Sequence, residues 1–160
     1  MSFSGKRFRR TGGSNLEDFL KASSESVFFC AVEICELVFE QPDLLDAPEK
    51  IKRLLETNAP VWCFTKIDEE TLSFQLQAPE MNVNKTFKLN QEQELNRLDG
   101  RKVFVTFSLE GDNVLKQRIR HTDGKIAYFR REFGPRTATM TITMEGADVR
   151  KAHIFYEMIE

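Results

Sequence analysis

Arg131 is the residue of this chain best placed to hold an anion away from water. It lies in the run KIAYFRREF, where alternation places Ala127, Phe129, Arg131 and Phe133 on one face of an expected strand. A buried carboxylate is stable only with charge-assisted hydrogen bonds, which a guanidinium supplies. The alternative is that Arg131 pairs with a glutamate on a solvated face. A single arginine among aromatic and small residues favours the first interpretation, an anion site on an inward face.

Two further arginines belong to the neighbouring run VLKQRIRH. Arg118 and Arg120 share one face of this expected strand with Lys116. Either arginine could supply a second cation to the same anion. A solvated face explains all three residues with fewer assumptions, and we favour that interpretation.

Few other residues combine into a chemical site. His121 and His153 have no metal-ligand spacing with cysteine, and Cys30 and Cys35 lack the second pair that a zinc site needs. No glycine-rich phosphate loop follows a strand into a helix, and no Ser-His-Asp or Cys-His set can be assembled. We therefore expect no enzyme, no cofactor and no metal.

Composition and charge narrow the class of protein. The chain has 160 residues, 41% of them hydrophobic, which suits a single domain spanning 1–160. A net charge of −2 gives no reason to expect nucleic acid as a partner. The N-terminus lacks the apolar core of a secretory signal, and no run is apolar enough to span a bilayer. Three cysteines fit reduced thiols, so we expect a cytoplasmic protein.

The second half of the chain predicts an antiparallel meander. Runs of about 8–10 residues rich in Val, Ile, Phe, Thr and Tyr are separated by turn signals that contain glycine. The runs are RKVFVTFSL, VLKQRIRH, KIAYFRREF, TATMTITM and VRKAHIFYEM, and the turns are EGDN, TDG, GPR and EGAD.

The first half adds a helical insert and further strands. Residues 5–11 predict a first strand that ends at Gly12 and Gly13, and helical patterns follow in an insert at about 14–58. The period then returns to two in strands at Val61–Ile67, Thr71–Ala78, Lys85–Leu89 and, more weakly, Gln91–Arg97, with a turn at 79–84. The total is about ten strands.

This series of pieces resembles the intracellular lipid-binding proteins, the family of fatty-acid- and retinoid-binding proteins. No single piece is specific, but their order and spacing over most of the chain are similar to the family's. The pieces are Phe3-x-Gly5, Asn15-Leu16-Glu17-Asp18-Phe19, Asp99-Gly100-Arg101-Lys102, Leu109-Glu110-Gly111, Asp123-Gly124, Arg131-Glu132-Phe133, Thr141-Ile142-Thr143-Met144-Glu145-Gly146 and Tyr156-Glu157.

The resemblance implies a ten-stranded antiparallel up-and-down barrel with a helical cap between the first two strands. The chain departs from the family at Arg7, where an aromatic residue is usual, and in the insert, which is much longer than usual. In the family the cap gates ligand entry, so an enlarged cap leaves the route and the ligand size open.

The family's anionic-ligand members hold a carboxylate with two arginines and a tyrosine. The resemblance maps one arginine onto Arg131. On the last strand, one register places Ile154 at the second arginine position and Tyr156 at the tyrosine position, and a one-residue slip gives His153 and Phe155. The face that holds Ile154 and Tyr156 is the more apolar, so we prefer the first register. One arginine of the clamp is missing in either case.

The resemblance implies reversible binding of one long-chain fatty acid or similar hydrophobic anion inside the barrel. The expected ligand-binding residues are Arg131, Tyr156, Phe129, Ile154, Leu16, Phe19 and Phe28. Lys50, Lys52 and Arg53 could touch anionic membranes transiently, although a solvated helix face also explains them. The family is generally monomeric, so we expect a monomer.

Three other functions remain open on the sequence. The missing arginine permits a carrier of a neutral ligand, such as a retinoid, a sterol or a monoacylglycerol. The wide apolar arc of a helix predicted from Ser26 to Gln41 permits a protein-interaction module whose barrel is filled with side chains. A calycin-like enzyme would need a catalytic set of polar residues in the pocket, and we cannot assemble one from this sequence.

Overall fold

A computed structural model describes residues 1–14, 61–78, 81–96, 102–122, 124, 126–145 and 151–159. The predicted helical cap falls almost entirely outside the described residues. The same holds for six residues that were assigned to ligand entry or membrane contact: Leu16, Phe19, Phe28, Lys50, Lys52 and Arg53.

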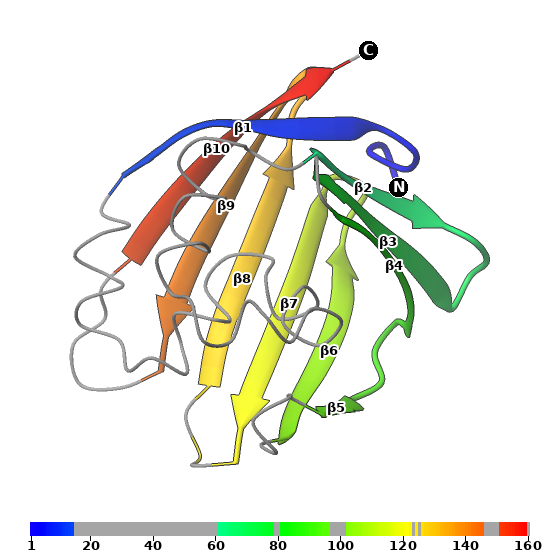
Figure 1. The fold of residues 1–160 in the computed structure, drawn as a ribbon, viewed down its shortest axis with the longest axis vertical. Helices are drawn as coiled ribbons and strands as arrows, with labels where there is room; N and C mark the ends of the chain where they lie inside the picture. Colours follow the sequence, from blue (N-terminus) through cyan, green and yellow to red (C-terminus); the bar gives the residue numbers. More distant parts are fainter. Residues whose placement is uncertain are drawn as a thin grey trace.

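Ten antiparallel strands form the described part of the molecule (Figure 1). Their bounds are β1 Arg7–Ser14, β2 Val61–Lys66, β3 Thr71–Ala78, β4 Met81–Lys88, β5 Gln93–Asn96, β6 Lys102–Glu110, β7 Val114–His121, β8 Ile126–Phe133, β9 Thr137–Met144 and β10 Lys151–Ile159. The prediction of a ten-stranded antiparallel meander is confirmed.

The strands form one sheet that wraps into a nearly closed barrel. Its order is β4-β3-β2-β1-β10-β9-β8-β7-β6-β5. β1 pairs with both β2 and β10, so it connects strands β2–β4 to strands β5–β10. The sheet has its two edges at β4 and β5. Beyond β4, Leu89 forms a single bridge to Phe107 of β6, and the Asn90 amide donates to the Phe107 carbonyl at 2.8 Å. The chain therefore crosses the gap between the edges at this point.

Two strand boundaries differ from the sequence prediction. β4 begins at Met81 rather than Lys85, because residues 81–84 pair in register with β3, Asn82 with Gln77 and Asn84 with Gln75. Asparagine is a poor strand former in isolation, but pairing with a neighbouring strand decides its conformation here. β5 is shorter than predicted and covers Gln93–Asn96.

The third difference is at Gly12 and Gly13, which were predicted to end the first strand. β1 instead runs through them to Ser14, with a bulge between Arg10 and Gly12 that leaves Thr11 as the extra residue. A bulge bends a strand and lets it follow the curve of a barrel. At Gly13 the strand lies so close to β10 that an added Cβ would be 2.9 Å from the carbonyl oxygen of His153. The glycine is what permits this close approach.

Gly13→Ala should therefore destabilise the barrel by about 1–3 kcal/mol, because one of two paired backbones must move. Gly12→Ala is the matched control, since a Cβ there meets nothing within 4 Å. We expect its free energy of unfolding to stay within about 0.5 kcal/mol of the wild type. Urea unfolding of both variants measures the difference. Equal effects would show that the close approach to His153 is not the constraint.

The interior is packed with side chains from one face of every long strand. Alternation is clear in β8 and β10, where every second residue is buried. At one end, Phe3 stacks on Phe133 with ring centroids 3.7 Å apart, and Trp62 meets Phe133 edge-on at 5.8 Å. The N-terminal segment is tied to this end, because the Ser2 amide donates to the Asp112 carbonyl at 2.8 Å. Aromatic rings thus fill the end of the barrel where the chain begins.

The described part of the chain contains no helix long and apolar enough to cross a bilayer.

Candidate functional site

Arg131 lies inside the barrel. β8 alternates buried and accessible residues, and Arg131 falls on the buried face with Ala127, Phe129 and Phe133. Only 2% of Arg131 is exposed, which makes it one of the largest fully enclosed side chains among the described residues. The Arg131 side chain therefore lies on the inward face, as the sequence predicted, and not on the solvated face.

Gln117 and Phe64 are two of the described residues that contact the Arg131 guanidinium. Nη1 donates a hydrogen bond to Oε1 of Gln117 at 2.9 Å, and Cζ lies 5.1 Å from the ring centroid of Phe64. Gln117 belongs to β7, next to β8, whereas Phe64 belongs to β2 on the other side of the interior. The amide fixes the direction of one N–H, and the ring face stabilises the positive charge.

Gln117 was missed on the sequence. A signal was available, since alternation places Gln117 with Leu115 and Ile119, both of which are buried. A single amide on an otherwise apolar face indicates that a polar partner faces it from another strand. That partner is Arg131.

The neighbouring strands place the other predicted residues around Arg131. Arg131 of β8, Met140 of β9 and Ile154 of β10 are paired in register across three strands. Ile154 is fully buried and Tyr156 is 3% exposed, whereas Phe155 is 41% exposed. The register with Ile154 and Tyr156 inside is therefore the one that forms, and the alternative with His153 and Phe155 inside is wrong. The position that could have held a second arginine is filled by an aliphatic side chain.

Trp62 is a second residue that sequence reasoning missed. It is fully buried, meets Tyr156 edge-on at 4.9 Å and Phe64 at 5.4 Å, and so connects Tyr156 to the ring that faces Arg131. Its Nε1 has no hydrogen-bond partner among the residues that the structure describes. The signal was its place in VWCFTK, where alternation pairs it with Phe64 on the inward face.

Arg118 and Arg120 do not contribute to this site. Both lie on the outer face, where Arg120 Nη2 is 2.7 Å and Arg118 Nη1 3.5 Å from the carboxylate of Glu92. Lys116 lies on the same face, 2.7 Å from Glu110. The idea that either arginine replaces the missing cation is wrong, because residues of even number in β7 point away from the interior.

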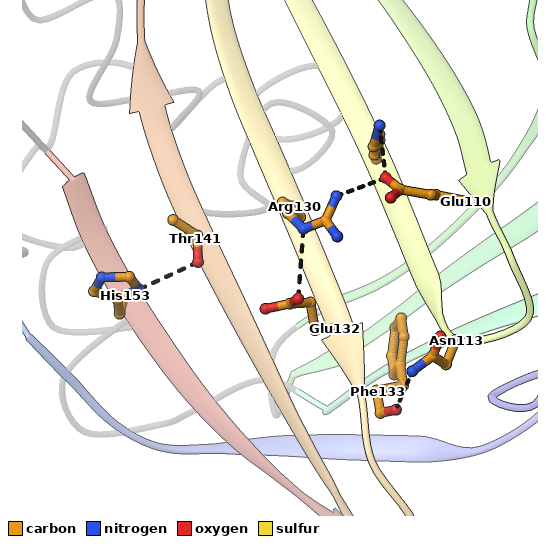
Figure 2. A network of polar contacts seen from close by, with 8 residues as sticks. Glu110, Asn113, Arg130, Glu132, Phe133, Thr141 and His153 are labelled. Carbon is orange, nitrogen blue, oxygen red and sulfur yellow. Dashed lines mark hydrogen bonds and ion pairs between the residues drawn. The ribbon is translucent and has the colours of Figure 1, made fainter. Parts of the chain in front are cut away.

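Glu110 joins two cations on the outer face (Figure 2). Its Oε2 lies 2.7 Å from both Arg130 Nη1 and Lys116 Nζ. The hydrogen bond from Arg130, followed by that from Lys116, lowers the pKa of Glu110 from 4.5 to about 2. The carboxylate therefore remains ionised in mildly acidic solution.

Glu110→Gln should remove a pH-dependent part of the stability. Because the folded pKa lies below the unfolded one, the ionised carboxylate stabilises the fold above about pH 4.5, and this contribution disappears as the pH falls through about 2. Between these values the wild type should lose stability relative to the variant, and added salt should reduce the difference. Urea unfolding at stepped pH measures it. A difference that is constant across this window would contradict the assignment.

No group of three or more His, Cys, Asp or Glu side chains that could hold a metal ion occurs in the described ranges.

Comparison with known proteins identifies the fold. No family model matches the chain, and no curated protein matches it. Solved structures do match, among them a Schistosoma mansoni fatty-acid-binding protein in complex with arachidonic acid, with a TM-score of 0.68 and 18% identity over 99% of this chain and 97% of that one. A Manduca sexta fatty-acid-binding protein gives 0.66 and 19% over 97% and 98%. A Drosophila melanogaster brain fatty-acid-binding protein gives 0.64 and 21% over 97% and 98%. The chain has the ten-stranded barrel fold of these proteins.

Proposed function

We propose that this protein is a cytoplasmic carrier that binds one long-chain fatty acid, or a similar hydrophobic anion, reversibly inside its barrel. The fold supports a carrier rather than an enzyme, since the similar structures named above are those of fatty-acid-binding proteins. The predicted entry residues Leu16, Phe19 and Phe28 and the membrane-facing residues Lys50, Lys52 and Arg53 remain part of this proposal.

The observation that carries the proposal is the enclosed guanidinium of Arg131. A cation 2% exposed, among Phe64, Phe129 and Met140, has lost nearly all of its hydration. Such a charge favours an anion beside it, and the fork of a guanidinium matches the two oxygens of a carboxylate. Gln117 already orients one N–H of this fork. Tyr156, two residues beyond Ile154 on the inward face of β10, carries the hydroxyl that we assign to the same head group.

The inward residues further from the aromatic end favour an aliphatic tail. In register with Phe129 lie Ile142 and Ala152, and Ala127 follows two residues from Phe129 on β8. These side chains are small or aliphatic, in contrast to the rings around Phe133. Each methylene that a tail buries there would contribute about 0.8 kcal/mol to binding.

The proposal is tested by competition with a fluorescent fatty acid, using oleic acid, methyl oleate and retinol as competitors. We expect oleic acid to displace the probe at least tenfold more effectively than methyl oleate, because esterification removes the charge that Arg131 recognises. Equal displacement by the ester or by retinol would instead indicate the neutral-ligand carrier.

A specific observation favours a second candidate, the protein-interaction module with a filled barrel. Rings from opposite walls touch, with the centroids of Phe64 and Phe107 6.0 Å apart, and most inward side chains are less than 4% exposed. In that case no lipid would enter, and the competition experiment would show no displacement by any of the three compounds.

A further inference from the structure

The outer face of β6–β10 carries a groove separate from the interior. The groove has a volume of about 510 Å³ and lies over the middle of these five strands. It is lined by two adjacent rows of residues that are in register across the sheet, together with Gln117 and Phe129, which lie between the rows on β7 and β8. The upper row is Ser108, Lys116, Arg130 and Thr141. The lower row is Thr106, Arg118, Tyr128, Thr143 and Lys151. We call these the two central rows.

The two central rows hold four permanent cations and no carboxylate. The acidic residues beside the rows stand in the flanking positions, Glu110 and Glu132 on one side and Glu92 and Glu145 on the other, and Glu145 Oε2 accepts a hydrogen bond from the Tyr128 hydroxyl at 3.4 Å. Two of these carboxylates are shared, since Glu110 pairs with Lys116 and Arg130, and Glu92 pairs with Arg118 and Arg120 (Figure 2 shows the former). Among the described residues, Glu132 pairs with Arg130 alone, at 3.5 Å. With Arg120 included, five cations face four carboxylates, so the region of the groove keeps a net positive charge.

The lower row is the less neutralised of the two. Glu92 binds Arg120 at 2.7 Å but stands 3.5 Å from Arg118, so its carboxylate is committed mainly to Arg120. Lys151, at the other end of the row, makes no ion pair with any residue that the structure describes. Between the two cations lie the hydroxyl of Thr143 and the ring of Tyr128, which is 40% exposed.

We propose that this groove binds a small soluble organic phosphate. Phosphate oxygens accept hydrogen bonds from guanidinium, ammonium and hydroxyl donors, all of which line the groove. The organic part of the ligand packs on the exposed ring of Tyr128. A flat anionic bilayer is disfavoured, because it would also press on Glu110, Glu132 and Glu92 in the flanking positions. A compact ligand between Arg118 and Lys151 of the lower row stays clear of Glu110 and Glu132, which pair with the cations of the upper row.

Titration calorimetry with 1-naphthyl phosphate tests the proposal on the full chain. We expect the double variant Arg118→Gln/Lys151→Gln to bind the probe at least tenfold more weakly than the wild type. The matched control is Lys102→Gln/Arg136→Gln, which removes the same net charge from exposed positions outside the groove. It should bind within twofold of the wild type. Equal melting temperatures of all three proteins would show that the fold is intact.

Two further measurements distinguish binding of the phosphate group from binding of the aromatic ring or of a membrane. Uncharged 1-naphthol should bind at least tenfold more weakly than the phosphate, and phosphatidylserine vesicles should retain the wild type and Arg118→Gln/Lys151→Gln to the same extent, because any membrane contact through Lys50, Lys52 and Arg53 is independent of the groove. The proposal is overturned by an absence of probe binding up to about 1 mM, by equal losses in both double variants, or by retention on vesicles that Arg118→Gln/Lys151→Gln abolishes. Oleic acid competition should be unchanged in that variant, so this site and the interior site can fail independently.

Discussion

Arg131→Met should lower the affinity for oleic acid by about 10- to 100-fold. Hydrogen bonds to a charged group contribute about 1.5–3 kcal/mol, and each 1.4 kcal/mol is a factor of ten in affinity. Methionine keeps a similar length and an apolar surface, so it removes the charge without leaving a large void. Replacing a buried charge by an apolar side chain of similar volume is often neutral or stabilising. The Gln117 amide loses its partner in this variant, which opposes the gain, so the free energy of unfolding should stay within about 2 kcal/mol of the wild type.

Arg130→Met is the matched control for this experiment. Arg130 is the adjacent residue of the same strand but lies on the outer face, where it pairs with Glu110 and Glu132. Oleic acid should bind this variant as it binds the wild type. An Arg131→Met variant that keeps full affinity for oleic acid would remove Arg131 from the site. An unchanged affinity for retinol or a monoacylglycerol in the same variant would then support the neutral-ligand carrier.

Trp62→Ala should destabilise the barrel by about 3–5 kcal/mol. The Trp62 ring touches Phe8 at 4.9 Å, Phe133 at 5.8 Å and Tyr156 at 4.9 Å, so one side chain connects β2 to β1, β8 and β10. The neighbouring rings cannot fill the volume that Trp62 leaves unless the strands that carry them move. A loss of this size is a large fraction of the 5–15 kcal/mol that stabilises a typical domain. Urea unfolding followed by far-ultraviolet circular dichroism measures it.

Two controls accompany this variant. Ile67→Ala removes a large apolar side chain that is 57% exposed, and it should change the free energy of unfolding by less than about 0.5 kcal/mol. Trp62→Phe keeps a ring against Phe8 and also removes the Nε1 group, which has no partner in the described part of the chain, so its cost should be well below that of alanine. A Trp62→Ala variant as stable as Ile67→Ala would show that the aromatic end does not hold the barrel together.

The inward faces of the later strands were predictable because side-chain alternation is a local property. In β8 and β10, knowledge of which residues are apolar is enough to place Arg131, Ile154 and Tyr156 inside. The turns that separate these strands contain Glu-Gly and Asp-Gly pairs, which also act locally. The resemblance to the family then supplied the order in which the strands close into a barrel.

The features that were missed depend on contacts between distant parts of the chain. Asn82 and Asn84 join β4 only because β3 pairs with them, and Gly13 continues β1 only because β10 lies against it. The contact between Arg131 and Phe64 requires β2 and β8 to face each other across the interior. The alternation of residues within one strand does not show which distant strand faces it across the interior. For the same reason the pairing of Arg118 and Arg120 with Glu92 was not seen, since Glu92 lies just before β5.

Native mass spectrometry of the purified protein, followed by organic extraction and identification of the lipid, is the most direct test of the carrier function. We expect a one-to-one adduct that extraction identifies as a long-chain fatty acid, and Arg131→Met purified in the same way should carry much less of it. Protein that is empty and that also fails to take up added oleic acid would contradict the account.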